Sequence, residues 1–184
     1  MQQSNTEDSP TDGEGTMAEV ARLWEKALNE CHTPKTQKVA LRISLVLGKS
    51  GGVYPTFRML TRMLQGGPQG SGNQMMSWIH ITDLSGLIYT LANHHNPPPI
   101  VNAAAPEPLS NRAFMREFRS SLHVGIGIGA PAWTIKLGTA VLGVDSELVL
   151  RGMHVVSVRT EALGFHFEYP TLASALSDLA ATKS

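Results

Sequence analysis

The chain has 184 residues, of which 42% are hydrophobic and 16% charged, and its fifteen basic residues balance its fifteen acidic ones. A net charge near zero gives no reason to expect nucleic acid or an anionic membrane surface as a partner. Cys31 is the only cysteine, so no intrachain disulfide can form, and no apolar run approaches the roughly 18 residues of a membrane span. We expect an intracellular, cytoplasmic protein without a signal peptide or transmembrane segment.

The first part of the chain predicts a disordered lead-in, a helix, a strand and a second helix. Residues 1–15 are polar and predict disorder. Apolar residues spaced by three and four predict a helix over 17–31. Residues 39–48 are nearly all apolar apart from Arg42, which predicts one buried strand of a parallel sheet. Residues 53–65 predict a helix. Its inner face is expected to carry Val53, Phe57, Leu60 and Leu64.

The middle of the chain continues this alternation. Residues 75–79 predict a short strand, and a helix follows up to about His94, with Asp83 placed to cap its start. Residues 100–104 predict another strand, and 110–122 predict a helix. The expected inner face of that helix holds Ala113, Phe114, Phe118 and Leu122.

The last third is expected to be mostly helical. Alternating helices and strands in the first two thirds favour an α/β fold with parallel strand pairing. The predicted later elements are helices over 131–142, 145–153 and 172–179, a turn over 158–163 closed by Gly164, and a strand-like segment over 165–169.

Gly125 to Ala130 satisfies the pattern G-x-G-x-x-G/A of dinucleotide-binding loops. Such a loop must follow a strand and open a helix, so that its amides meet a pyrophosphate. Here a helix ending near Leu122 leaves no room for the strand, and Pro131 removes one amide. We interpret the segment as a flexible connector.

The sequence gives only weak support for a metal site or a catalytic nucleophile. The seven histidines contain no H-x-x-x-H or H-x-H pair, and Cys31 has no partner thiol, so no metal site is predicted. Gly70-Ser-Gly72 lacks the strand and helix that a hydrolase nucleophile elbow requires. In the strand that follows, alternation places Trp78 and His80 on one side. From these residues alone, Trp78 is a core residue and His80 a buried histidine with a partner.

Several segments nevertheless resemble successive landmarks of the extended short-chain dehydrogenases, and most closely the atypical epimerase family branch called 39U. The resemblance covers nearly the whole chain from residue 6. The segments that carry it are 41–48, Gly51-Gly52, 65–74, 77–84, 101–108, 148–152 and 164–172.

The resemblance implies the carboxy-terminal part of a Rossmann-type parallel sheet plus a small, mostly helical carboxy-terminal lobe. On this basis, residues 16–124 are the remnant of an NAD(P)-binding domain and 125–184 are a substrate-side domain. The glycine-rich loop and first strands of such a domain, roughly one hundred residues or more, would precede residue 7. The implied cofactor of the full-length family is NADP or NAD, and we expect none to be bound by this chain alone.

Two departures from the wider family bear on activity. Its Tyr-x-x-x-Lys pair would fall near residues 16–21, where Thr16 or Met17 and Val20 or Ala21 stand instead. Met76 occupies the position of an arginine that pairs with diphosphate in nucleotide-sugar epimerases, and a methionine cannot replace that donor. We therefore assign no catalytic residue and expect no nucleotide-diphosphate sugar.

The expected site residues follow from strand ends that face the ligand crevice of such sheets. Gly48 is the expected cofactor contact, and Gln74, Ser77 and His80 are the expected lining of a pocket for an unknown small molecule. One hypothesis is a truncated isoform, split gene or incomplete gene model without independent catalysis. The other is a non-catalytic binding or interaction module that folds alone or as a dimer, with self-association through an uncovered sheet edge.

Overall fold

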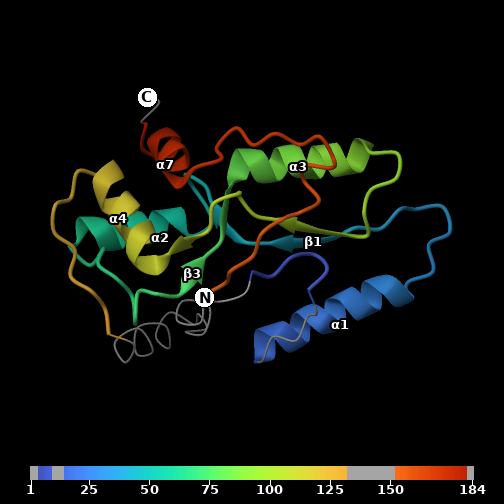
Figure 1. Cartoon of the computed structure of the whole chain (residues 1–184), viewed down its shortest axis with the longest axis horizontal. Coiled ribbons are helices and arrows are strands. Elements are labelled where there is room, and N and C mark those ends of the chain that lie inside the picture. Colours follow the sequence, from blue (N-terminus) through green and yellow to red (C-terminus); the bar gives the residue numbers. More distant parts are fainter. Residues whose placement is uncertain (1–3, 10–14, 132–151, 182–184) are drawn as a thin grey trace.

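A computed structural model describes residues 4–9, 15–131 and 152–181 (Figure 1). No helix within these ranges is long and apolar enough to cross a membrane. The helices predicted over 131–142 and 145–153 lie outside the described residues, except for their ends. One of those ends, Met153, forms an isolated parallel bridge with Met76.

The described helices form near the ranges that the sequence predicts. They are α1 (Thr16–Glu30), α2 (Tyr54–Arg62), α3 (Ile81–Asn93), α4 (Asn111–Ser121) and α7 (Leu172–Ala180). Ser110 caps α4, because its Oγ accepts a hydrogen bond from the N–H of Ala113. In the same way, Thr171 accepts a hydrogen bond from the N–H of Ser174 at the start of α7.

Helix α2 ends earlier than predicted, and its buried face differs. Tyr54, Phe57 and Thr61 are buried, whereas Leu64, which we expected on the inner face, is 46% exposed. Leu64 has a φ of 62°, a left-handed conformation that a helix cannot continue through. The expected inner face was therefore correct only at Phe57 and, as partly buried residues, at Val53 and Leu60.

The single strand expected over 39–48 is two strands that pair with different partners. Strand β1 (Ala40–Ile43) runs parallel to β5 (Ile100–Ala103), and β2 (Leu45–Leu47) runs parallel to β4 (Trp78–His80). Ser44 lies at the change of partner, where both its N–H and its Oγ donate to the carbonyl of Ala103. A buried serine that bonds this carbonyl ends one ladder without leaving its polar groups unpaired.

The strand expected over 75–79 is also divided. Strand β3 (Met75–Met76) pairs antiparallel with β6 (Leu109–Ser110), which the sequence did not predict, and Ser77 separates it from β4. Residues 165–169 form no strand, although we expected one there. The turn that precedes them closes at Gly164, which has a φ of 68°, as predicted.

The sheet strands separate two hydrophobic clusters. Helix α3 packs against β4 and β5 in one cluster, and α2, α4 and α7 surround Trp78 in the other (Figure 1). Trp78 belongs to the second cluster and Ile79 to the first, so the predicted alternation of β4 is confirmed. The aromatic rings of the second cluster are Tyr54, Phe57, Trp78, Phe114 and Phe118.

The amino-terminal segment lies beside β5 and pairs with residues 154–156. Asn5 forms a parallel bridge with Val155, its N–H donating to His154 and its carbonyl accepting from Val156. Glu7 is only 4% exposed and accepts three hydrogen bonds. The expectation of disorder over 1–15 is therefore wrong for residues 4–9, because a buried, fully bonded carboxylate fixes them.

Candidate functional site

His80 and Gly48 lie at adjacent strand ends, as the sequence predicts. His80 closes β4 opposite Leu47, the last residue of β2, and Gly48 follows directly. A Cβ on Gly48 would lie 3.5 Å from the Cβ of Ile81, the first residue of α3. The carboxyl ends of parallel strands are where α/β folds bind ligands.

The glycine turn after β2 presents backbone rather than side chains at this edge. Gly52 has a φ of 66°, and a Cβ there would come within 2.1 Å of the Val46 carbonyl oxygen, so only glycine fits. The N–H of Val53 donates to that same carbonyl. A group bound beside Gly48 would therefore meet a tight, closely packed backbone turn.

His80 holds the start of α3. Its Nδ1 accepts a hydrogen bond from the N–H of Thr82 at 3.2 Å, so the neutral ring carries its proton on Nε2. Nε2 lies 3.5 Å from Oδ2 of Asp178 on α7, a long distance for a hydrogen bond, and the Tyr169 ring stacks at a centroid distance of 4.1 Å. His80 is 1% exposed, which confirms the interpretation of a buried histidine with partners.

The protonation states around His80 follow from burial. Burial lowers the pKa of His80, and the nearby carboxylates of Asp178, Asp83 and Glu168 oppose that shift only in part. Burial, together with hydrogen bonds to the carboxylates of Glu168 and Asp178, raises the pKa of Tyr169 to about 12. The pair is therefore a neutral imidazole beside a protonated phenol at neutral pH.

Asp83 does not cap α3, contrary to our expectation, because His80 occupies the cap position. The Asp83 carboxylate instead accepts hydrogen bonds from the backbone N–H groups of Glu168 at 2.7 Å and Tyr169 at 3.1 Å. Burial raises the pKa of Asp83, and these two hydrogen bonds work against that rise. Asp83 thus fastens the segment before α7 onto α3, and so places Tyr169 against His80.

Gln74 and Ser77 lie apart from this edge, and their side chains form hydrogen bonds within the fold. The Gln74 amide donates to the carbonyl of Gln69. The Ser77 hydroxyl accepts the N–H of Val155 at 2.7 Å and lies 2.8 Å from the carbonyl of Met153. The structure thus brings Gly48 and His80 together but not Gln74 and Ser77. Met76 is buried in the second cluster, 2% exposed.

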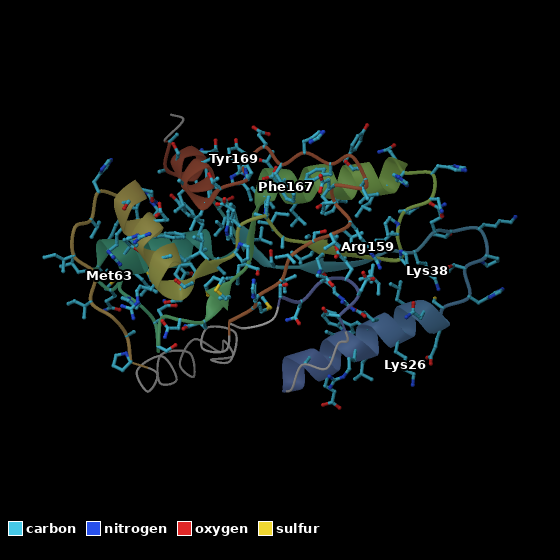
Figure 2. The ribbon with its side chains drawn as sticks, viewed as in Figure 1. Lys26, Lys38, Met63, Arg159, Phe167 and Tyr169 are labelled. Atoms are coloured by element: carbon cyan, nitrogen blue, oxygen red, sulfur yellow. The ribbon has the colours of Figure 1, made fainter. Side chains whose placement is uncertain are left out.

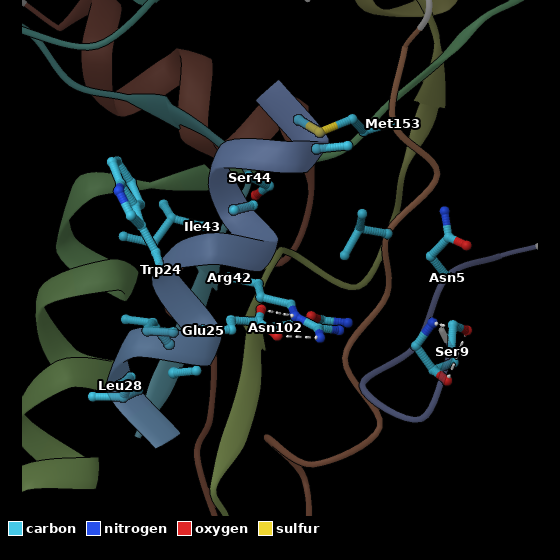
Figure 3. A pocket seen from close by; sticks show the side chains of 16 residues that line it. Asn5, Ser9, Trp24, Glu25, Leu28, Arg42, Ile43, Ser44, Asn102 and Met153 are labelled. Atoms are coloured by element: carbon cyan, nitrogen blue, oxygen red, sulfur yellow. Dashed lines mark hydrogen bonds and ion pairs between the residues drawn. The ribbon is translucent and has the colours of Figure 1, made fainter. Parts of the chain in front are cut away.

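A second feature, which the sequence did not predict, is a cavity of about 620 Å³ between α1 and the β1–β5 pair (Figure 3). Arg42 and Glu25 form a two-pronged ion pair inside it, with N–O distances of 2.7 and 2.9 Å. Asn102 also lines it and is 1% exposed, and within the described part of the chain its Oδ1 has no hydrogen-bond partner. The only signal in the sequence was Arg42 within an apolar strand.

The described residues offer no metal site, because no three of their His, Cys, Asp or Glu side chains lie together. The connector 125–130 is irregular up to Ala130, and it follows α4 rather than a strand. Its amides are partly used within the fold, since Ile128 donates to the carbonyl of Leu64.

Parallel strands joined through helices, with a glycine turn at their carboxyl ends, define a Rossmann-like α/β protein. A family model described as a domain of unknown function (DUF1731) matches residues 130–179. The chain is 37% identical over 171 residues to the "Epimerase family protein SDR39U1 homolog, chloroplastic" of Arabidopsis thaliana, covering 92% of this chain and 48% of the relative.

Solved structures agree. The structure of human epimerase family protein SDR39U1 (isoform 2) with NADPH matches with a TM-score of 0.85 and 32% identity, over 97% of this chain and 60% of that one. A nucleoside-diphosphate sugar epimerase from Corynebacterium glutamicum shares the fold, with a TM-score of 0.75 at 24% identity, over 97% of this chain and 34% of that one. Over nearly its whole length the chain matches epimerase family proteins of the SDR39U1 branch, as its sequence motifs indicated. It spans about half the length of the curated relatives it matches, from 48% to 59%.

Proposed function

We propose that this chain supplies the later strands and the substrate side of an epimerase-family NAD(P)-binding protein, and that it neither binds a dinucleotide nor catalyses a reaction alone. The observation that carries this proposal is the edge of β1 that no described strand pairs with, which lies beside the cavity under α1. An NAD(P)-binding protein of this class needs further parallel strands on that side to hold the cofactor.

The pairing pattern shows which groups are available at this edge. Ala40 donates to the carbonyl of Pro99 and Ser44 to that of Ala103, so alternate residues of β1 face β5. The backbone groups of Leu41 and Ile43 then face the other way. Among the described strands, none pairs with them. An open parallel edge is a template for one more strand.

The surfaces around the edge are apolar and uncovered. Ile43 is 49% exposed, and on α1 Leu23 is 57% and Trp24 is 72% exposed. No described residue of α1 is buried, although the helix has a clear apolar stripe. Such a helix is stabilised when a partner covers its stripe, and the residues that the structure describes leave it open.

The test is calorimetric titration of the 184-residue chain with NADPH, alone and mixed with an amino-terminal fragment of the Arabidopsis relative. We expect no saturable binding by the chain alone and saturable binding by the mixture. Ile43→Lys would weaken binding by the mixture, because a charge at the edge opposes strand pairing. Ile126→Lys, at a connector position that is 69% exposed, is the matched control. Saturable NADPH binding by the chain alone would contradict the proposal.

The second candidate is a non-catalytic module that associates with itself through the same edge. The exposed Trp24 and Ile43 favour it, since two copies could cover each other's apolar surface. Size-exclusion chromatography with light scattering separates the candidates. A stable dimer that Ile43→Lys dissociates, and that gains no NADPH binding from the added fragment, would favour the module.

A further inference from the structure

A second, smaller cavity of about 270 Å³ lies on the outer side of α2. Three of its lining side chains are cations, namely Lys49, Arg58 and Arg62, and none is an acid. The others are Pro55, Met59 and Met63, and the two methionines are 54% and 60% exposed. We call these six residues the α2 groove.

The cations of the α2 groove are not neutralised by any acid of the described residues. Within the described ranges, no carboxylate forms an ion pair with any of them. Arg58 and Arg62 are four residues apart on one helix face, where like charges repel each other and destabilise a helix. An anion between them would remove this repulsion and gain charge-assisted hydrogen bonds.

Lys49 connects the α2 groove to the carboxyl edge of the sheet. It follows Gly48 at the end of β2, and its Nζ donates to the carbonyl of Ala181, the residue that caps the end of α7, at 3.0 Å. The groove therefore begins where the ligand crevice of such a sheet is expected. It lies apart from the cavity under α1, since Met63 lies at the left of the molecule and Lys26 of α1 at the lower right (Figure 2).

We propose that the α2 groove binds the phosphate group of a small phosphorylated ligand. Two guanidinium groups supply planar pairs of N–H donors that match phosphate oxygens, and Lys49 adds a third positive charge. Pro55 and the two methionines provide an apolar floor for the part of the ligand next to the phosphate. This inference does not depend on the proposed function, because it concerns a different surface.

The experiment is isothermal titration of the 184-residue chain with inorganic pyrophosphate at low and moderate salt. We expect saturable binding that weakens as salt increases. The double variant Arg58→Gln/Arg62→Gln removes two charges and should lower the affinity by about tenfold or more, as expected for lost hydrogen bonds between charged groups. Both side chains are exposed, so the fold should persist, and circular dichroism melting verifies it.

The matched control is Lys26→Gln/Lys35→Gln, which removes two positive charges at other exposed sites. Unchanged pyrophosphate affinity in this control supports a defined site. An equal loss in both double variants would show a general charge effect and overturn the proposal. Absence of saturable binding by the unmodified chain, or equally tight binding of citrate, would overturn it as well.

Discussion

The buried carboxylate of Glu7 accepts the backbone N–H of Asn102 at 3.0 Å and so joins the start of the chain to β5. The same carboxylate accepts the Ser157 hydroxyl at 2.6 Å and the N–H of Val158 at 3.0 Å. Burial raises the pKa of Glu7, but the hydrogen bonds from these three residues outweigh it, and the net shift is downward. Glu7 therefore stabilises the fold in its charged form.

Glu7→Gln should lower the free energy of unfolding at pH 7 by about 1–3 kcal/mol, because an amide cannot accept at both ends and leaves buried donors unpaired. Urea denaturation measures the loss. Asp8→Asn is the control, since the Asp8 side chain is 73% exposed and its ion pair with Arg159 contributes about 1 kcal/mol or less.

The role of Glu7 also predicts how the stability of the fold changes with pH. A carboxyl with a lowered pKa contributes stability above its ordinary value of 4.5, and that contribution is lost as the pH falls through the folded-state pKa. The difference in the free energy of unfolding between the unmodified chain and Glu7→Gln should therefore decrease below about pH 4.5. A gap that is constant from pH 7 to pH 3 would contradict this account.

His80 should make the fold less stable in mild acid. Its pKa is lowered from 6.5, so the unfolded chain takes up a proton first as the pH falls below that value. Stability is thus complete above pH 6.5 and declines as the pH falls through the folded-state pKa of His80. His80→Asn keeps a good helix-capping residue but cannot titrate, so its stability should change less between pH 7.5 and 5.5. Identical pH profiles for both proteins would exclude His80 as the cause.

Ser77→Ala should destabilise the fold by about 1–3 kcal/mol, because the N–H of Val155 would lose its buried acceptor. Thermal denaturation followed by circular dichroism measures this. Ser85→Ala is the comparison, since the Ser85 hydroxyl is exposed and bonds only the carbonyl of Ile81 within α3. If both variants melt at the same temperature, the bonds of Ser77 contribute little to stability.

Gly152→Ala should cost more than Gly164→Ala, although both glycines have a left-handed φ, of 67° and 68°. At Gly164 a Cβ meets nothing within 4 Å, so the cost is the backbone strain of about 1–2 kcal/mol. At Gly152 a Cβ would also lie 2.5 Å from the Met75 carbonyl oxygen, which must move. Equal chemical denaturation midpoints would contradict this difference.

Local signals in the sequence predicted the helices well but not the sheet. The cap at Ser110 and the apolar stripe of α4 are properties of neighbouring residues, so they can be found without the fold. The division of 39–48 at Ser44 depends on the carbonyl of Ala103, which is 59 positions away. No local pattern encodes that contact. Strand β6 has only two residues, too few to show alternation.

The site was predictable only where a general rule applied. Gly48 and His80 share an edge because both follow or close parallel strands, and that rule needs no side-chain detail. Gln74 and Ser77 look equally polar in sequence, but the fold uses them to hold the 69–74 loop and the 153–155 segment. The cavity under α1 depends on how α1 packs over β1. The only indication of it in the sequence was the charged Arg42 within an apolar strand.

The bridge between Asn5 and Val155 also sets an order of events during synthesis. The hydrogen-bonding partners of Asn5, His154 and Val156, are synthesised about 150 positions after it. At translation rates of about 5–20 residues per second, the amino-terminal segment stays unpaired for on the order of ten seconds. The segment is therefore a late-folding element, and the nascent chain exposes the β5 surface under Glu7 until residues 154–158 have been made.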